Sequence, residues 1–407
     1  MLFACGVVVQ DKNAGAIRAG DLFAGDLQVN SGVPECAKTT IAGDGTSFDM
    51  NDFRMINRIR LHAHGISLHF KHITRHLLAP FCLIPKLAVL VLLASCATNA
   101  PFAAPKPRLG HPIITSGYFD LPDGVRRPYR LYKARGYVKI VVLALHGYTD
   151  SRDGWLIPAQ ALTPHGVMVY APDLSSFGAT KNRGVWPGTE RLVNEARVEA
   201  LQLRALYPHT PLYIMGESMG GAIGILLGAS ANPPPVNGYI LAAPAVWGGP
   251  ALSPFYKMAL RVADALAPGM RLTGQQAHVL ASDNIPALIA FGEDPLTLQA
   301  PRISNIAGLV RLMGQAQRAC AHFDQPALFL YGGHDELIPQ EAMRDCWQNL
   351  PARAPVTLAY YPADYHLLLR DLERAVPDAD IVAFMQHHQL PSDSPSQATI
   401  FLATAGD

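Results

Sequence analysis

From about residue 112 onward, short apolar runs rich in β-branched residues alternate with longer stretches whose apolar positions have helical spacing. This alternation is typical of βαβ units and predicts an α/β fold, with a mainly parallel sheet and helices on both faces. The predicted strands are 128–134, 139–146, 167–172, 211–216, 238–243, 327–332 and 356–361.

Two segments between these strands predict helices that pack on the sheet. Residues 189–206 carry apolar side chains at Leu192, Ala196, Ala200 and Leu203, with charged residues on the opposite face. Residues 219–229 are apolar all round and rich in small residues, which indicates a buried helix held closely against strands.

The segment 246–320 interrupts the alternation, because it has no clear strand and contains turn signals such as Gly248-Gly249-Pro250. An insertion of this kind between two strands predicts a helical lid. Its apolar residues either line an acyl-chain pocket or pack the lid onto the body of the domain. They are Phe255, Met258, Leu260, Leu266, Met270 and Leu272.

The chain before residue 112 has a different character. Residues 87–95, LAVLVLLAS, form an apolar run that follows Lys86 and is too short to span a bilayer, but has the length of a signal-peptide core. Residues 1–76 are then either a disordered extension or a stretch that precedes the true start of translation. The predicted organisation is 1–76 extension, 77–96 signal segment, 97–111 linker, 112–390 folded domain and 391–407 loose polar tail.

The end of the apolar run, Leu93-Ala94-Ser95-Cys96, resembles the bacterial lipobox. That resemblance implies a lipid on Cys96 and an exported protein anchored to a membrane on its periplasmic or cell-surface side. The alternative is an uncleaved hydrophobic segment that ends in cysteine, in which case the protein is cytoplasmic.

Composition excludes several classes of protein. A hydrophobic content of 49% supports a large core, and 33 Lys and Arg against 32 Asp and Glu leave a formal net charge of +1. No basic run interleaved with aromatic residues favours a nucleic-acid partner, and no C-x-x-C pair indicates structural zinc. The sequence indicates no metal and no organic cofactor, and it does not reveal the oligomeric state.

The strongest chemical signal is Gly216-Glu217-Ser218-Met219-Gly220, which follows an apolar predicted strand and opens the small-residue helix. G-x-S-x-G between a strand and a helix is typical of a nucleophile elbow, whose tight turn requires glycines at Gly216 and Gly220. The alternative is a purely structural Gly-Ser turn. We interpret Ser218 as a nucleophile.

A serine nucleophile needs a general base and an acid that orients the base. In the order usual for this motif both follow the serine, each after a later strand. His366 follows the last predicted strand, and His334, His322 and His387 are its rivals. Asp335 follows the preceding strand and is favoured as the acid over Glu336 and Asp364. The alternative for Asp335 is an ordinary solvated carboxylate on a loop.

Developing negative charge on a carbonyl oxygen requires two N–H donors. The backbone of Met219, directly after the nucleophile, is one candidate. The turn His146-Gly147-Tyr148 supplies the other through the amide of Tyr148, with His146 as a hydrogen-bonding support for the loop.

Together HGYTDS, PDLSSFG, GESMGG, GGHDELIP and DYHLLLRD resemble the monoacylglycerol lipase and lysophospholipase branch of the α/β-hydrolases, which includes serine aminopeptidase-like members. The resemblance covers roughly residues 125–390 and implies the α/β-hydrolase fold with the roles given above. One departure is Asp173-Leu174-Ser175-Ser176, because relatives carry an arginine two residues after this aspartate. Its absence puts local charge pairing in doubt.

The leading hypothesis is a serine ester hydrolase that cleaves acyl esters, monoacylglycerol-like or lysophospholipid-like, through an acyl-enzyme on Ser218. A peptidase or amidase would use the same triad, with Glu293 and Asp294 offered to an amino terminus. A non-catalytic lipid-binding lipoprotein is the third hypothesis. In an exported protein, Cys320 and Cys346 would either form a disulfide that braces the acid loop or remain two buried thiols.

Overall fold

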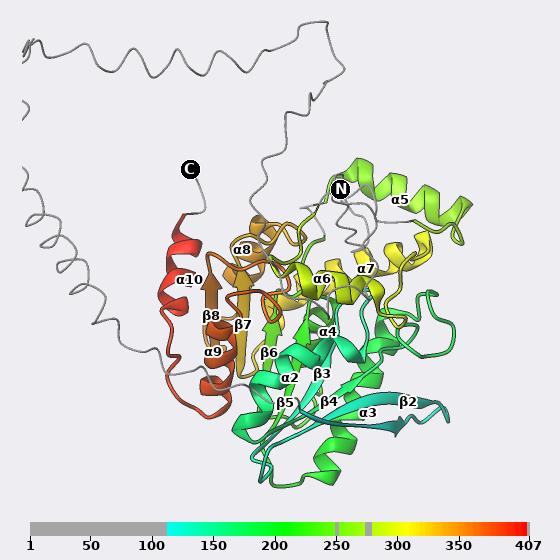
Figure 1. The fold of residues 1–407 in the computed structure, drawn as a ribbon. Coiled ribbons are helices and arrows are strands. Elements are labelled where there is room, and N and C mark those ends of the chain that lie inside the picture. Colours follow the sequence, from blue (N-terminus) through cyan, green and yellow to red (C-terminus); the bar gives the residue numbers. More distant parts are fainter. Residues whose placement is uncertain (1–111, 249–251, 273–278, 405–407) are drawn as a thin grey trace, which may run out of the picture. The chain divides into compact units, whose positions relative to one another are not determined.

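The computed structural model describes residues 112–248, 252–272 and 279–404 (Figure 1). The predicted extension 1–76, the signal segment 77–96 with Cys96, and the linker 97–111 lie outside the described residues.

The described residues form one sheet of eight strands in the order β1-β2-β4-β3-β5-β6-β7-β8. β1 and β2 are antiparallel to their neighbours, and the six strands from β4 to β8 run parallel. The carboxyl ends of the parallel strands therefore share one edge of the sheet. The strands are β1 Ile113–Asp120, β2 Arg126–Lys133, β3 Ile140–Leu145, β4 Val167–Pro172, β5 Leu212–Glu217, β6 Gly238–Ala242, β7 Ala327–Gly332 and β8 Val356–Tyr361.

Helices cover both faces of the sheet, as predicted. Side chains alternate between faces along each strand, so β3 sends Val141 and Leu143 to one hydrophobic core and Ile140 and Val142 to the other. α3, α4, α7, α8 and α10 contribute buried residues to the first core, and α2 and α9 to the second. Their bounds are α2 Leu156–Leu162, α3 Thr189–Leu206, α4 Met219–Gly228, α7 Ile303–Ala319, α8 Gln340–Asn349, α9 Ala375–Met385 and α10 Ser394–Ala403.

The insertion between β6 and β7 is helical, but only part of it is separate from the body of the domain. It contains α5 (Pro254–Leu266), α6 (Ile285–Glu293) and α7. α7 packs against α4 and buries residues such as Ile306 and Leu312 in the first of the two cores. The predicted lid over 246–320 was therefore too long, because its last helix is the crossover that connects β6 to β7.

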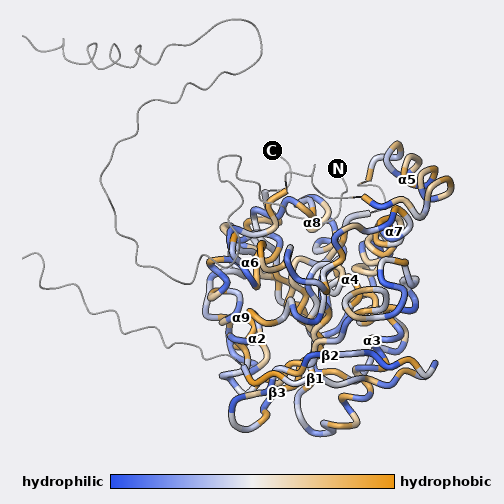
Figure 2. Tube along the Cα trace, turned by 45° about the vertical axis from the view of Figure 1, so that its right-hand side comes forward, coloured by the Kyte–Doolittle hydropathy of each residue, from blue (hydrophilic) through white to orange (hydrophobic). Residues whose placement is uncertain are grey.

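The apolar side chains of the insertion that the structure describes do not pack uniformly onto the body of the domain. α5 has no buried residue, and Phe255 and Leu266 are 75% and 81% exposed. Met258 and Met270 are exposed as well, whereas Leu260 and Leu272 pack partly against the core. Figure 2 shows this helix at the outside of the described residues, with hydrophobic positions along it. α5 thus presents an uncovered apolar face.

The prediction of a loose tail over 391–407 is wrong. α10 packs along β8, where the ring of Phe401 stacks on that of Tyr360 with 4.5 Å between ring centroids. At the start of the helix, the hydroxyls of Ser392, two residues before it, and of Ser394, its first residue, both donate to the buried carboxylate of Asp380. The polar composition that suggested a tail is used for these hydrogen bonds, while a few apolar residues dock the helix.

Candidate active site

Ser218 occupies a sharp turn between β5 and α4. Its backbone has φ of 54°, in the left-handed region that a non-glycine residue adopts at a cost of roughly 1 to 3 kcal/mol. The turn is held by a hydrogen bond of 2.9 Å from the Ser218 amide to the carbonyl of Ala242 on β6. The residue is partly exposed, whereas those on either side of it are buried. The hydroxyl therefore stands accessible at the start of a helix, at the carboxyl edge of the sheet.

The two glycines of this elbow (residues 216–220) are required by close packing. A Cβ on Gly220 would collide with the carbonyl of Leu145 at the end of β3, and a Cβ on Gly216 would collide with the backbone of Gly220. Both contacts are with backbone atoms, which cannot move aside as a flexible side chain does. The tight turn thus requires glycine at both positions, as the G-x-S-x-G motif predicted.

His366 and Asp335 lie on loops that follow β8 and β7, and the structure brings them into contact. Nδ1 of His366 lies 2.8 Å from Oδ2 of Asp335, and both side chains are almost completely buried. Burial lowers the pKa of His366, but the charge and hydrogen bond of Asp335 raise it together with the charges of Glu217 and Asp371, so the pKa is raised overall. An ionised carboxylate only accepts hydrogen bonds, which places the proton on Nδ1 and leaves Nε2 able to accept one.

The second oxygen of Asp335 is fixed by the backbone. Oδ1 accepts hydrogen bonds from the amides of Leu337 at 2.8 Å and Ile338 at 2.9 Å. The two other carboxylates considered for this role do not meet the histidine. Glu336 accepts from the amide of Leu280, and Asp364 forms no hydrogen bond to His366. Asp335 is the carboxylate that meets the histidine.

The rival histidines stand apart from this arrangement. His322, His334 and His387 are exposed, whereas His366 is 2% exposed. Among the described residues no hydrogen bond joins Ser218 to His366. The structure thus brings the predicted acid into contact with the predicted base.

The loop after β3, residues 146–150, lies beside the elbow and is named the oxyanion loop here. A Cβ on Gly147 would come within 3.4 Å of the Ser218 Cβ. His146 supports the loop, because its Nε2 accepts from the amide of Leu174 at 3.0 Å and its Nδ1 lies 2.8 Å from the Gly147 carbonyl. Burial lowers the pKa of His146, which keeps the ring neutral. The residue before Tyr148 thus lies against the nucleophile.

The other predicted oxyanion donor, Met219, is the first residue of α4 and is fully buried. Its amide belongs to the helix N-terminus, where the unpaired N–H groups and the helix dipole favour negative charge. The two predicted donors therefore belong to two different elements, the N-terminus of α4 and the loop after β3.

The charge of Asp173, left in doubt by the sequence, is satisfied from a different part of the chain. Arg152, in the short 3-10 helix Arg152–Trp155, forms an ion pair with the Asp173 carboxylate and donates its own amide to Oδ1 at 2.8 Å. The amide of Ala179 donates to Oδ2. An arginine from the segment after the oxyanion loop thus neutralises Asp173, although none stands two residues after it.

The sequence did not single out a buried ionic cluster beside the elbow. The guanidinium of Arg370 donates to the carboxylates of Asp150 and Glu217, and all three residues are at most 5% exposed. The available signal was the charged residue in each motif, in HGYTDS, GESMGG and DYHLLLRD. The sequence does not show which of these charges pair, because their partners lie in other motifs and meet only in the fold.

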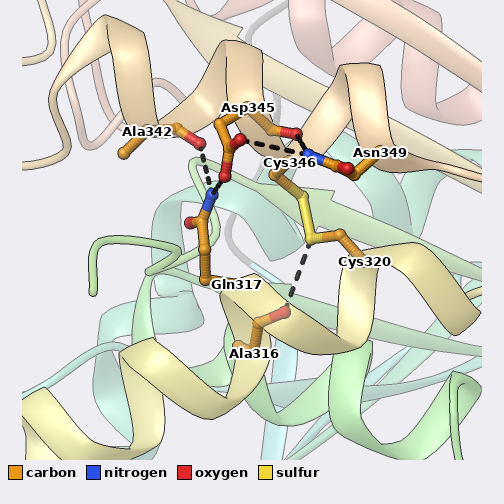
Figure 3. Close-up of a disulfide and its surroundings, with 7 residues drawn as sticks. All are labelled: Ala316, Gln317, Cys320, Ala342, Asp345, Cys346 and Asn349. Atoms are coloured by element: carbon orange, nitrogen blue, oxygen red, sulfur yellow. Dashed lines mark hydrogen bonds between the residues drawn. A yellow bond between two sulfur atoms is a disulfide. The ribbon is translucent and has the colours of Figure 1, made fainter. Parts of the chain in front are cut away.

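Cys320 and Cys346 form a disulfide with 5.4 Å between the Cα atoms. Figure 3 shows the bridge between the end of α7 and α8, with Gln317 of α7 hydrogen-bonded to the carbonyl of Ala342 and to the carboxylate of Asp345. α8 begins directly after the loop that carries Asp335. The bridge and these hydrogen bonds hold α8, and with it one end of the acid loop, against the body of the domain.

Within the part of the chain that the structure describes, no group of three or more His, Cys, Asp and Glu side chains is placed to hold a metal ion.

A family model described as serine aminopeptidase, S33, matches residues 136–373, which is more than half of the chain and includes Ser218, Asp335 and His366. The chain belongs to this family. Its members have the α/β-hydrolase fold, and the mainly parallel sheet with helices on both faces is that fold in this chain. The predictions of fold and of a hydrolytic enzyme are therefore confirmed.

Relatives and solved structures agree with this assignment. The chain is 28% identical over 269 residues to a monoacylglycerol lipase of Mycolicibacterium smegmatis, covering 65% of this chain and 94% of the relative. It is 27% identical over 263 residues to the monoglyceride lipase of Rattus norvegicus, covering 63% and 86%. The structure of a Paleococcus ferrophilus monoacylglycerol lipase matches with a TM-score of 0.54 and 21% identity over 64% of this chain and 98% of that one, which supports the fold.

Proposed function

We propose that this member of the family hydrolyses carboxylic esters of acyl chains, of the monoacylglycerol or lysophospholipid kind, through an acyl-enzyme on Ser218. The observation that carries the proposal is the arrangement at the carboxyl edge of the sheet. Ser218 stands on the strained elbow after β5, and the buried pair of His366 and Asp335 follows the strands β8 and β7.

In this mechanism Nε2 of His366 accepts the proton of the Ser218 hydroxyl as its oxygen attacks the ester carbonyl. Asp335 holds the imidazole in the required tautomer and stabilises its positive charge. The amides of Tyr148 and Met219 donate to the oxyanion. The imidazolium then gives its proton to the leaving alcohol, and water, activated by the same histidine, releases the fatty acid from Ser218.

Two observations favour a lipid ester as the substrate. The relatives named above are monoacylglycerol lipases, and they align over most of their own length. The uncovered apolar face of α5 provides a surface for an acyl chain or for the lipid phase from which it comes. Phe255, Met258 and Leu266 of this face are exposed in a helix that belongs to the insertion between β6 and β7.

Asp294, one of the two acidic residues offered for an amidase, has other partners. Asp294 accepts from the amide of Leu296 at 2.8 Å and from the hydroxyl of Ser151 at 3.3 Å. Asp294 and Glu293 line a surface pocket of about 570 Å³ together with Arg183 and Arg271, so the lining carries both signs of charge. Such a pocket gives no preference for an amino group, and the ester proposal is favoured over the amide.

A substrate panel tests the proposal. The purified protein is given p-nitrophenyl esters of two to sixteen carbons, 1-monoacylglycerols, a lysophosphatidylcholine and aminoacyl-anilides, with release of fatty acid or aniline measured. We expect kcat/KM to be highest for medium or long acyl esters and at least about a hundredfold lower for the anilides, because the exposed face of α5 is apolar. A preference for anilides would contradict the ester proposal, and no turnover of any substrate, with no labelling by a fluorophosphonate, would support the lipid-binding alternative.

We further propose that the protein is exported and tethered to a membrane through a lipid on Cys96. The disulfide between Cys320 and Cys346 supports this, because disulfides persist in oxidising compartments. Among the described residues no helix has both the length and the apolar character needed to cross a bilayer. Mass spectrometry of the mature protein from a bacterial membrane fraction is expected to find an acylated Cys96 at the N-terminus, and Cys96→Ser should abolish it. A mature N-terminus upstream of residue 77 would contradict this.

A further inference from the structure

Three catalytic loops meet at one buried arginine. Arg370 lies in the loop after β8, residues 362–374, which is named the histidine loop here because it carries the proposed base four residues earlier. Nη2 of Arg370 donates to Oδ2 of Asp150 in the oxyanion loop and to Oε2 of Glu217 in the elbow, the latter at 2.6 Å. One guanidinium nitrogen thus joins all three.

Each partner lies next to a residue of the proposed chemistry. Glu217 directly precedes Ser218, so its position and that of the nucleophile are linked through one peptide unit. Asp150 follows Tyr148 by two residues, and its second oxygen accepts from the amide of Ser151 at 2.7 Å. A displacement of either carboxylate would therefore move the nucleophile or an oxyanion donor.

The cluster is built into the fold rather than formed by chance on a surface. The Arg370 carbonyl accepts a hydrogen bond of 2.7 Å from Nδ2 of Asn284, in the segment that leads into α6. The carboxylate of Asp150 fills the space in which a Cβ on Gly154 would lie. The arginine is thus held at its backbone and at its head group.

We propose that Arg370 is a positioning residue that fixes the oxyanion loop, the elbow and the histidine loop relative to one another, so that donors, nucleophile and base keep the geometry needed for acyl transfer. The inference rests on the proposed function, which it deepens. A displacement of about 1 Å in such a constellation can lower the rate by about a hundredfold.

The cluster also influences the base electrostatically. When ionised, its two carboxylates and one guanidinium leave a net negative charge. The charged groups that act on His366 are Asp335, Glu217 and Asp371, and each raises its pKa against the effect of burial. Burial raises the pKa of Glu217 itself, and the charge of Arg370 counteracts this. Removal of the Glu217 charge should therefore lower the pKa of His366.

The test compares Arg370→Lys, Arg370→Gln and Glu217→Gln with the wild-type protein on p-nitrophenyl butyrate. We expect kcat to fall about tenfold for R370K and about a hundredfold for R370Q, with KM changed less than threefold. Lysine should retain part of the activity because its positively charged ammonium can still form an ion pair with the carboxylates of Asp150 and Glu217. E217Q keeps a hydrogen-bond acceptor for Arg370, so kcat should fall less than it does in R370Q, while the acid limb of kcat/KM moves to lower pH.

A matched control is Arg127→Lys. Arg127 is also buried and paired with carboxylates, at 2.7 Å from Glu195 and 3.8 Å from Glu199, but it contacts none of the three loops. R127K should lower the thermal unfolding midpoint and leave kcat and the pH profile unchanged. A merely structural role for Arg370 would give the same result at both arginines.

Folding is addressed with a charge-balanced variant. If R370Q does not fold because two carboxylates lose their cation, the double variant Arg370→Gln/Glu217→Gln removes one of them. Reduced kcat with unchanged KM in folded R370K or in the double variant supports the proposal. Wild-type kcat in both would overturn it. Failure of the wild-type protein to hydrolyse esters or to label with a fluorophosphonate would instead remove the proposed function, and this inference with it.

Discussion

Replacing Ser218 by alanine is expected to lower kcat for ester hydrolysis by roughly 10⁴- to 10⁶-fold, to the level left by the oxyanion donors and binding alone. The hydroxyl oxygen is the atom that forms the acyl-enzyme, and no other group in the proposed mechanism can replace it. Hydrolysis of p-nitrophenyl butyrate measures the loss, and a fluorophosphonate probe measures the reactive serine directly. Wild-type protein should label and S218A should not.

Ser176→Ala is a suitable control for this variant. Ser176 is also a serine with positive φ, at 72°, and is buried in a different loop. S176A should keep labelling and kcat within about twofold of wild type. Equal thermal unfolding midpoints for S218A and wild type would show that the lost activity reflects chemistry rather than folding. Labelling of S218A at an undiminished rate would rule out Ser218 as the nucleophile.

Asp335→Asn is expected to lower kcat by about 10³- to 10⁴-fold while the protein stays folded. The asparagine carbonyl can still accept from the amides of Leu337 and Ile338, so the loop keeps its shape. Its amide group then donates toward His366, which turns the imidazole into the tautomer whose Nε2 carries a proton and cannot accept one. Steady-state kinetics from pH 5 to 9 measure the effect.

The pH dependence gives a second readout for this variant. The carboxylate raises the pKa of His366, and the histidine must be neutral to act as a base, so wild-type activity should rise with pH through that pKa. In D335N the residual activity should reach its plateau at lower pH. Glu336→Gln is the control, because Glu336 is the exposed neighbour and its glutamine can still accept from Leu280. Wild-type activity in D335N would assign the acid elsewhere.

Sequence pattern predicted the strands of the sheet because most of them are buried on both faces. β3 to β8 appear as continuous apolar runs, and their predicted ends agree with the structure to within two residues. β1 was missed because it is mostly exposed and mixes Thr, Ser and Gly with its apolar residues. α10 was missed because its stability comes from packing on β8, which its local composition does not reveal.

The proposed catalytic residues could be predicted from the sequence for a different reason. The elbow needs glycines at fixed spacing, and the acid and base follow strands whose order along the chain is known for the motif. The ionic partners were not accessible, because Asp150, Glu217 and Arg370 are far apart in sequence and meet only in the folded sheet. Arg152 and Asp173 show the same dependence on tertiary structure.

The disulfide makes residues 320–346 a covalent ring that contains β7 and the turn with Asp335. When its segment unfolds with the disulfide intact, such a ring has fewer conformations available than a free segment of the same length. Local melting around the carboxylate would therefore be brief and confined. A single cut by a protease inside the ring would leave the two fragments joined by the disulfide. They would separate only after the disulfide was reduced.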